Sequence, residues 1–300
     1  MIKCVATDMD GTLLDAKMQV SQENKKAIEA AQAQGVEVVV ATGRSYFEAR
    51  FALDEADIHC PVICINGAET RDPEGNIVEQ AFLPVDQALE VYSMLKKAGL
   101  YFEIYTDQGT YTDDYEKALD IMVDIYLSGY TDLSPEQLRE EAKKRFDIGL
   151  LYLVDSYEPV IREGKHSIYK FLAYSFDEEK LEKASGLLER IPELAISSSG
   201  SENIEITHTD AQKGTALERF IESKGIRLEE TMAIGDNLND LSMLQKAGVP
   251  VAMENANPQV KQVCSYVTDL NDESGVASAI NRFILGKQVS SFHSPSLKQK

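Results

Sequence analysis

The segment Cys4-Val5-Ala6-Thr7-Asp8-Met9-Asp10-Gly11-Thr12-Leu13-Leu14 stands near the start of this 300-residue chain and indicates its architecture. An apolar run over residues 2–7 ends directly in acidic residues, which is typical of a buried strand that leads into a polar loop. Gly11 permits the chain to turn after the second aspartate. Asp8 and Asp10 can therefore face one site at the end of the strand.

Alternating strand and helix signals continue up to residue 66. Ser21 is the predicted N-cap of a first helix, and Gly35 is its predicted end. The β-branched run at residues 36–41 and the apolar run at residues 61–65 are predicted strands, the first of them buried on both faces. The order strand, helix, strand, helix, strand predicts a parallel sheet with right-handed crossovers.

The same alternation returns near the end of the chain, but the middle differs. Predicted helices and strands of the last part cover residues 213–224, 231–234, 240–247, 249–253 and 275–285. The turn signal at residues 72–76 predicts a hairpin that leaves the core. We therefore expect an α/β fold in which residues 1–84 and 206–286 form a parallel-sheet core. Residues 85–205 would form a smaller inserted α+β domain, and residues 287–300 a disordered tail.

Composition excludes several classes of function. The formal net charge of −20 argues against binding to nucleic acid or to anionic membranes, both of which require basic patches. No apolar run approaches the roughly 20 residues that span a bilayer, and no signal peptide is evident, so we expect a cytoplasmic protein. Cys60 and Cys64 are close enough for a metal or redox pair. Buried free thiols are the better interpretation, because no second Cys/His pair stands at zinc-like spacing.

Asp8 and Asp10 are the first candidate catalytic groups. A carboxylate can attack phosphorus to give an acyl phosphate, which water later cleaves. A neighbouring carboxyl group can protonate the leaving oxygen and afterwards activate water. The alternative interpretation is an acidic N-cap at the start of a helix.

Two further clusters offer groups that bind anions. Thr42-Gly43-Arg44 combines a hydroxyl with backbone N–H groups at the start of a helix, which favours an anion there. An ordinary N-cap and a solvated arginine are the alternative. Lys213, followed by Gly214, opens a helix directly after the inserted segment and can neutralise negative charge, although most single lysines lie on the surface.

The last cluster is Gly235-Asp236-Asn237-Leu238-Asn239-Asp240, which follows a predicted strand and enters a helix. Carboxylate oxygens are hard ligands that suit Mg²⁺, and this ion commonly takes only one or two of them from the protein. An Asx-turn with an N-cap would explain one of the aspartates but not the whole polar cluster.

Taken together, the motifs Asp-x-Asp-Gly-Thr-Leu, Thr-Gly-Arg, Lys-Gly and Gly-Asp-x-x-Asn-Asp resemble those of the haloacid dehalogenase-like (HAD) superfamily. The chain is most similar to the Cof-like phosphatases of that superfamily. Asn66-Gly67-Ala68 looks like the loop of this branch after its third core strand. The resemblance covers about residues 1–285 and implies a Rossmann-like core with an α/β cap inserted between the second and third motifs.

The resemblance also implies a role for each matching residue. Asp8 would be the nucleophile and a Mg²⁺ ligand, and Asp10 the general acid and base, whose backbone carbonyl also contacts the metal. Asp236 would ligate Mg²⁺ directly. The phosphoryl group would be bound by Thr42, Gly43, Lys213 and Asn239. The site would be supported by Asp240, Arg44 and Asn66.

These roles predict a Mg²⁺-dependent phosphatase that acts on small phosphorylated metabolites such as sugar phosphates. A true dehalogenase of the superfamily lacks the second aspartate, because a halide leaving group needs no proton. Two alternatives remain open at this point. A phosphotransferase or phosphomutase would use the same aspartyl phosphate, and a non-catalytic sensor would only bind a phosphorylated ligand. The substrate and the oligomeric state do not follow from the sequence.

Overall fold

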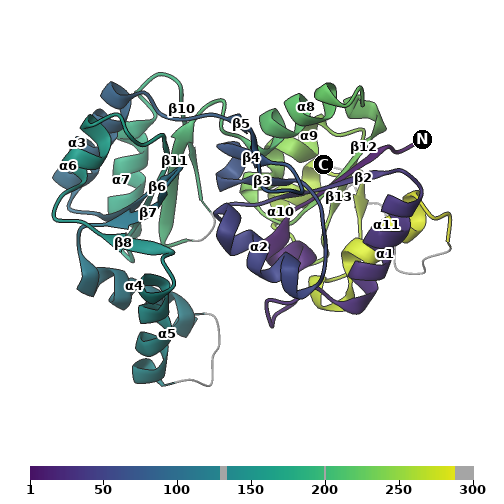
Figure 1. Cartoon of the computed structure of the whole chain (residues 1–300), viewed down its shortest axis with the longest axis horizontal. Helices are drawn as coiled ribbons and strands as arrows, with labels where there is room; N and C mark the ends of the chain where they lie inside the picture. The colour runs from purple at the N-terminus through teal and green to yellow at the C-terminus, as the bar shows by residue number, and fades with distance from the viewer. Residues whose placement is uncertain (129–133, 199–200, 288–300) are drawn as a thin grey trace, which may run out of the picture. The chain divides into compact units, whose positions relative to one another are not determined.

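The computed structural model describes residues 1–128, 134–198 and 201–287 of the chain. These residues separate into two compact units, which Figure 1 shows with their element labels. The first unit combines residues 1–81 with the chain from residue 210 onward, and the second comprises Phe82–Thr209. Almost all of the predicted tail, residues 287–300, lies outside the described residues.

The first unit is built on an eight-stranded sheet with the order β14-β13-β12-β1-β2-β3-β4-β5. Its strands are β1 (Cys4–Thr7), β2 (Glu37–Ala41), β3 (Val62–Cys64), β4 (Glu69–Arg71), β5 (Ile77–Gln80), β12 (Thr231–Gly235), β13 (Val249–Ala252) and β14 (Tyr266–Val267). The pairs from β14 to β3 are parallel, and β4 and β5 add antiparallel edge strands. The predicted α/β class with a parallel sheet is confirmed.

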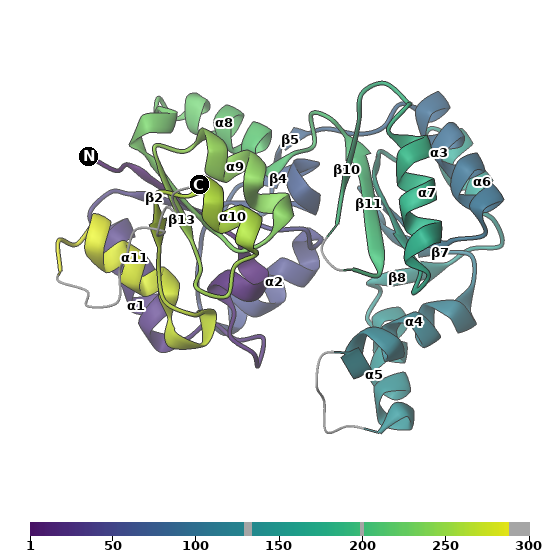
Figure 2. The same ribbon diagram turned by 180° about the vertical axis from the view of Figure 1, so that it is seen from behind.

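Helices cover this sheet. They are α1 (Gln22–Ala33), α2 (Tyr46–Glu55), α8 (Lys213–Ser223), α9 (Leu241–Lys246), α10 (Pro258–Val263) and α11 (Gly275–Phe283). Helix α1 packs against α11, and α8 packs against α9, as Figures 1 and 2 show from opposite sides. The central strands β1, β2, β3 and β12 are buried on both faces, which explains why Val38, Val39 and Val40 form a continuous apolar run rather than an alternating one.

One sequence expectation is wrong in detail. The turn at residues 72–76 does form a hairpin, with the Asp72 carboxylate accepting from the Asn76 backbone N–H at 2.8 Å. The hairpin does not leave the core, because its first strand, β4, pairs with β3 and so extends the main sheet. Local turn chemistry identified the hairpin, but its pairing partner depends on contacts that are distant in the sequence.

The second unit is an α+β layer structure around a six-stranded sheet with the order β10-β11-β9-β6-β7-β8. The strands are β6 (Tyr101–Thr106), β7 (Gly109–Thr112), β8 (Leu151–Leu153), β9 (Ile168–Tyr174), β10 (Leu194–Ser197) and β11 (Asn203–His208). The helices are α3 (Val85–Ala98), α4 (Tyr115–Ser128), α5 (Pro135–Asp147), α6 (Tyr157–Arg162) and α7 (Glu178–Leu188). Residues of α3, α6 and α7 form one apolar core with the strands.

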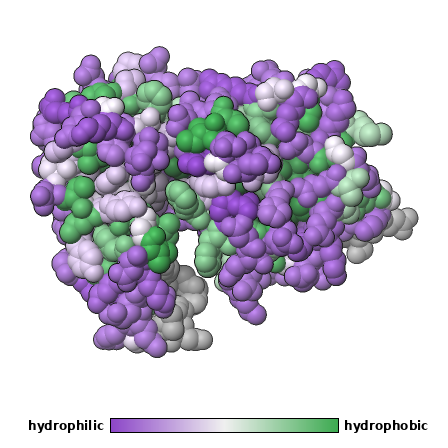
Figure 3. Space-filling view, viewed as in Figure 1, coloured by the Kyte–Doolittle hydropathy of each residue, from purple (hydrophilic) through white to green (hydrophobic). Residues whose placement is uncertain are grey.

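Polar groups are also buried in the second unit. Lys170 on β9 and Glu205 on β11 form an ion pair of 3.2 Å, and their side chains are 2% and 3% exposed. On the surface of the protein, hydrophilic residues cover most of the face drawn in Figure 3. None of the described helices combines the length and the apolar character that crossing a membrane would require.

Candidate active site

Asp8 lies at the carboxyl end of β1, in the middle of the parallel sheet. Its backbone N–H continues the strand pairing by donating to the Ile234 carbonyl at 2.9 Å. After Asp8 the chain makes one wide, irregular turn, Met9–Leu13, which the Leu14 N–H closes by donating to the Met9 carbonyl at 2.9 Å; Gly11 has a φ of +72° within it. Asp8 is only 5% exposed, so the sheet and this turn together hold its carboxylate in a buried position.

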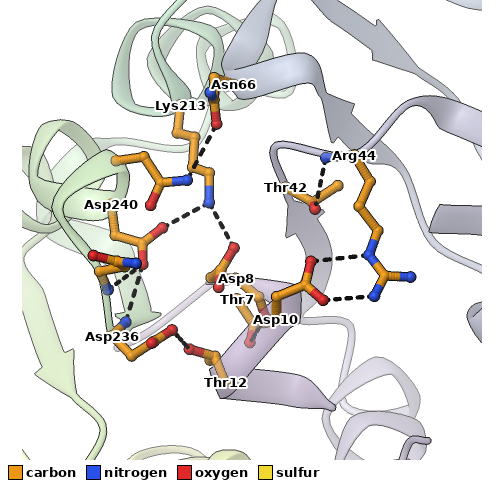
Figure 4. A network of polar contacts seen from close by, with 12 residues as sticks. Thr7, Asp8, Asp10, Thr12, Thr42, Arg44, Asn66, Lys213, Asp236 and Asp240 are labelled. Atoms are coloured by element: carbon orange, nitrogen blue, oxygen red, sulfur yellow. Dashed lines mark hydrogen bonds and ion pairs between the residues drawn. The ribbon is translucent and has the colours of Figure 1, made fainter. Parts of the chain in front are cut away.

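Lys213 is the direct partner of Asp8 (Figure 4). It is the first residue of α8 and is fully buried, and its Nζ lies 2.5 Å from Asp8 Oδ1 and 2.7 Å from Asp240 Oδ1. Burial lowers the pKa of Lys213, but the carboxylates of Asp240 and Asp8 outweigh that effect and raise it above its usual value. These two carboxylates therefore favour the cationic form of the lysine beside the predicted nucleophile.

Asp240 has a supporting position. Its Oδ2 accepts from the backbone N–H groups of Asp236 and Asn237, each at 3.0 Å, while its Oδ1 accepts from Lys213. Both carboxylate oxygens are thus engaged within the protein. The side chain holds Lys213 in place and ties the start of the loop after β12 to the helix that follows.

Asp236 follows β12 and faces the turn after Asp8. Thr12 Oγ1 donates to Asp236 Oδ1 at 2.7 Å, and a Cβ atom at Gly11 would lie 2.7 Å from Asp236 Oδ2. Gly11 is therefore required both for the turn and for this close approach. Thr12 was not among the predicted site residues, although it lies within the Asp-x-Asp-Gly-Thr segment that located the site.

Three carboxylates gather here. Oxygen atoms of Asp8, Asp236 and Asp240 lie within 4.8 Å of one another. Burial, and then the neighbouring Asp240, raise the pKa of Asp236 to about 6. The same two causes raise the pKa of Asp8 well above its usual range, against the opposing effect of Lys213. The single ammonium group of Lys213 does not balance three carboxylates when they are ionised. The cluster then carries an excess of negative charge, which favours the binding of a cation.

The donor set fits a hard divalent cation such as Mg²⁺. Such ions take carboxylate oxygens and keep several waters. Asp8 and Asp236 are the two carboxylates suited to hold the ion, because both oxygens of Asp240 already accept hydrogen bonds from the protein. Thr12 would orient the Asp236 ligand through its hydrogen bond.

Asp10 points away from this cluster, as Figure 4 shows. Arg44 donates two hydrogen bonds to the Asp10 carboxylate, from Nε at 2.9 Å and from Nη2 at 2.5 Å. The Asp10 side chain is 49% exposed, unlike that of Asp8. Arg44, predicted as a supporting residue for phosphate, therefore contacts the predicted general acid instead. Sequence reasoning did not anticipate this pair.

The other predicted phosphate-binding residues are linked to Arg44 and Asn66. Thr42 is fully buried after β2, and its hydroxyl accepts from the Arg44 backbone N–H at 3.1 Å. Asn239 donates from Nδ2 to Asn66 Oδ1 at 3.3 Å. Gly43 lies against the same Asn66 side chain, since a Cβ atom there would be 3.2 Å from Asn66 Oδ1. The structure therefore brings all the predicted residues to one end of the sheet.

Cysteine takes no part in this site. All four cysteines are buried and free. Burial raises the pKa of Cys60 to about 12, so its thiol stays protonated at neutral pH. Burial also raises the pKa of Cys64 well above its usual value. A thiolate is the form that binds metals, and burial disfavours the thiolate. Cys60 and Cys64 are therefore better described as buried free thiols than as a metal pair.

Comparisons with known proteins identify the family of the chain. A sequence model of the haloacid dehalogenase-like hydrolases matches residues 5–280. Phosphatase YwpJ of Bacillus subtilis is 35% identical, over 94% of this chain and 100% of its own. The 5-amino-6-(5-phospho-D-ribitylamino)uracil phosphatase YwtE of the same organism is also 35% identical, over 95% of this chain and 99% of its own.

Solved structures give the same result. A haloacid dehalogenase-like hydrolase from B. subtilis superimposes with a TM-score of 0.84 at 35% identity, and the match covers 94% of this chain and 100% of that one. The resemblance drawn from the four sequence motifs is thereby confirmed.

Proposed function

The chain belongs to the haloacid dehalogenase-like hydrolases and is a phosphatase, and from that premise we propose that it hydrolyses small phosphorylated metabolites through an aspartyl phosphate on Asp8, with Mg²⁺ as cofactor. One observation carries the proposal. The buried Asp8 carboxylate lies 2.5 Å from the Lys213 ammonium, within a cluster of carboxylates suited to a divalent cation. Following the sequence expectation, we place the enzyme in the cytoplasm.

Asp8 performs the first step. One of its carboxylate oxygens attacks phosphorus in line with the ester oxygen, the P–O ester bond breaks, and the phosphoryl group is transferred to Asp8. Asp10 gives its proton to the departing oxygen, because an alkoxide is a poor leaving group. Lys213 neutralises charge on the transferred group, and Thr42 and Asn239 hold its oxygens.

Asp10 also drives the second step. Now ionised, it takes a proton from water, and the resulting hydroxide attacks the phosphoryl group. The P–O bond to Asp8 breaks, inorganic phosphate leaves, and both carboxyl groups return to their starting states. For these steps the Asp10 carboxyl group must face the substrate, so its pair with Arg44 has to loosen or to turn with it.

The proposed Mg²⁺ ligands are Asp8, Asp236 and the backbone carbonyl of Asp10. When bound, the ion neutralises the phosphate charge and lets two anions approach each other. This requirement is acute here, because the whole chain carries a formal charge of −20 and repels phosphate esters at long range.

The relatives guide the choice of substrates. YwtE is named for a phosphorylated ribitylaminouracil, so that compound belongs in the first assay together with sugar phosphates, pyridoxal phosphate and p-nitrophenyl phosphate. We expect phosphate release with Mg²⁺, none with EDTA, and none from Asp8→Asn. The matched control is Asp57→Asn, a change of an exposed aspartate whose side chain is 76% accessible, and it should keep full activity.

Two results would contradict the proposal. Near-normal turnover by Asp8→Asn would rule out the aspartyl phosphate. An isomeric sugar phosphate, formed from a single sugar monophosphate without release of inorganic phosphate, would identify a mutase instead.

A further inference from the structure

Three consecutive residues after β3 adopt left-handed backbone conformations. Ile65, Asn66 and Gly67 have φ values of +49°, +56° and +101°. Glycine and asparagine adopt this region readily, but a β-branched residue such as isoleucine rarely does. Such strain persists only where the surrounding structure enforces it, and it concentrates at functional sites. We refer to residues 65–67 as the strained loop.

On one side, the strained loop holds the segment that carries Thr42. The Ile65 backbone N–H donates to the Arg44 carbonyl at 2.9 Å, and the Asn66 N–H donates to the Thr42 carbonyl at 2.9 Å. These two bonds fix the chain immediately before and after Gly43. The backbone conformation of the loop therefore decides where the Thr42 hydroxyl and the Gly43 N–H stand.

On the other side, the loop contacts the segments that carry Asn239 and Lys213. Asn66 Oδ1 accepts the hydrogen bond from Asn239 Nδ2, and the Asn66 side chain is buried, with 4% of the residue exposed. Gly67 lies against the peptide of Gln212, the residue before Lys213. A Cβ atom at Gly67 would stand 2.6 Å from the Gln212 carbonyl oxygen, so only glycine permits this approach.

We propose that Asn66 and Gly67 are positioning residues for phosphate binding: the strained loop holds Thr42, Asn239 and Lys213 in their mutual geometry. These three groups come from three separate elements, and they must meet one phosphoryl group within a fraction of an ångström. The strained loop is in contact with all three segments. The inference rests on the proposed function, because it assumes that these groups bind a phosphoryl group.

The first test is Asn66→Gly. Glycine accepts the same backbone conformation, so the protein should still fold and its melting temperature should fall only modestly, while the acceptor for Asn239 is lost. We expect kcat/KM to fall about fivefold to tenfold, which corresponds to one hydrogen bond. The matched control is Asp57→Gly, an exposed residue with a φ of +54°, which should change neither quantity.

A double-mutant cycle tests whether Asn66 acts through Asn239. If it does, Asn66→Gly combined with Asn239→Ala should lower kcat/KM no further than Asn239→Ala alone. A purely structural role predicts that the two losses multiply. Full additivity, or an Asn239→Ala variant with unchanged kcat/KM, would overturn the role assigned to Asn66.

Gly67→Ala tests the contact with Gln212. Its control is Gly35→Ala, because Gly35 has a φ of +79° and a Cβ atom added there would meet no other atom within 4 Å. Both variants place an alanine at a positive φ, +101° for Gly67 and +79° for Gly35, and both should melt at a lower temperature. Only Gly67→Ala should also lose about tenfold to a hundredfold in kcat/KM, since it displaces Lys213. Equal activity losses in the two variants would overturn the proposal for Gly67.

Binding of inorganic phosphate separates this inference from the proposed function. In the presence of Mg²⁺, phosphate should raise the melting temperature of the wild-type protein more than that of Asn66→Gly. If no substrate is hydrolysed but this difference is found, the proposed activity fails and the positioning role stands. Equal shifts in the two proteins, or no shift in either, would overturn the positioning role whatever the activity.

Discussion

At the scale of single residues, the site depends on one buried cation between two buried carboxylates. Lys213 is fully enclosed and contacts both Asp8 and Asp240. Removing one partner of a buried ion pair costs far more than the pair itself contributes, because an uncompensated charge is left without water. This asymmetry makes the lysine a structural residue as well as a candidate catalytic one.

Lys213→Met should therefore destabilise the metal-free protein by about 3 kcal/mol at neutral pH. The methionine fills a similar volume, so the loss reflects charge rather than a cavity. Adding Asp8→Asn should restore part of the loss, because it removes one of the two carboxylates that have lost their lysine partner. Urea unfolding in EDTA measures both effects, and a double variant no more stable than Lys213→Met would contradict this account.

Asp236 gives the site a pH dependence. Its pKa is raised from 3.8 to about 6, so the folded metal-free protein holds this proton more tightly than the unfolded chain does. The group therefore contributes stability below about pH 4, and that contribution is lost as the pH rises through 6. Mg²⁺ needs the ionised carboxylate, so its affinity should rise over the same interval.

We predict opposite effects of Asp236→Asn with and without metal. In EDTA, the substitution should raise the melting temperature more at pH 7.5 than at pH 5, because it removes a carboxylate that is unfavourable only when ionised. With saturating Mg²⁺ at pH 7.5, the wild-type protein should be the more stable of the two. The same melting temperature difference at both pH values would show that Asp236 keeps its ordinary pKa.

At the scale of elements, the start of α8 is placed by close packing against α9. A Cβ atom at Gly214 would lie only 2.1 Å from the Ser242 carbonyl oxygen, and the Gly214 N–H donates to Ser242 Oγ at 3.0 Å. Since Gly214 follows Lys213 directly, this contact also sets the depth at which the lysine enters the site. The glycine is required by packing rather than by backbone conformation.

A pair of helix glycines tests this point. Gly214→Ala should cost about 1–3 kcal/mol by overpacking and should also lower kcat, because α8 must shift. Gly186→Ala, in α7, meets no atom within 4 Å and should instead stabilise the protein by about 0.5–1 kcal/mol. Thermal unfolding and phosphate release measure both variants. A stable, fully active Gly214→Ala would show that α8 tolerates displacement at its start.

At the scale of the whole molecule, charge opposes the proposed function. A formal net charge of −20 repels phosphate esters at long range, whereas Lys213 and a bound cation attract them only within the site. Salt shortens the reach of the repulsion, from about 30 Å at 0.01 M to about 8 Å at 0.15 M. Contacts inside the buried site are screened much less.

Raising the ionic strength over this range, with Mg²⁺ kept saturating, should therefore increase kcat/KM severalfold for a phosphate dianion. The value of kcat should change little, because the bound complex is already formed. Steady-state kinetics in sodium chloride series check both expectations. A fall in kcat/KM with salt would mean that local attraction governs the approach of the substrate.

The amino-acid sequence alone was enough to predict the parallel sheet and the location of most residues of the candidate site. Asp8, Thr42 and Asp236 each follow a strand, and the carboxyl ends of parallel strands meet at one edge. Strand and helix signals are local, and they come from burial on both faces, from caps and from turns. The position of these residues along the chain was therefore enough to predict that they converge.

Only the tertiary structure decided which of these groups touch each other. The pairs Asp10–Arg44, Thr12–Asp236 and Asn66–Asn239 join residues that are 34, 224 and 173 positions apart. No local pattern encodes such contacts, because they depend on the strand order β12-β1-β2-β3 and on the rotamers that packing allows. For the same reason, the strained backbone at Ile65 and the engagement of both Asp240 oxygens became visible only once the elements were packed.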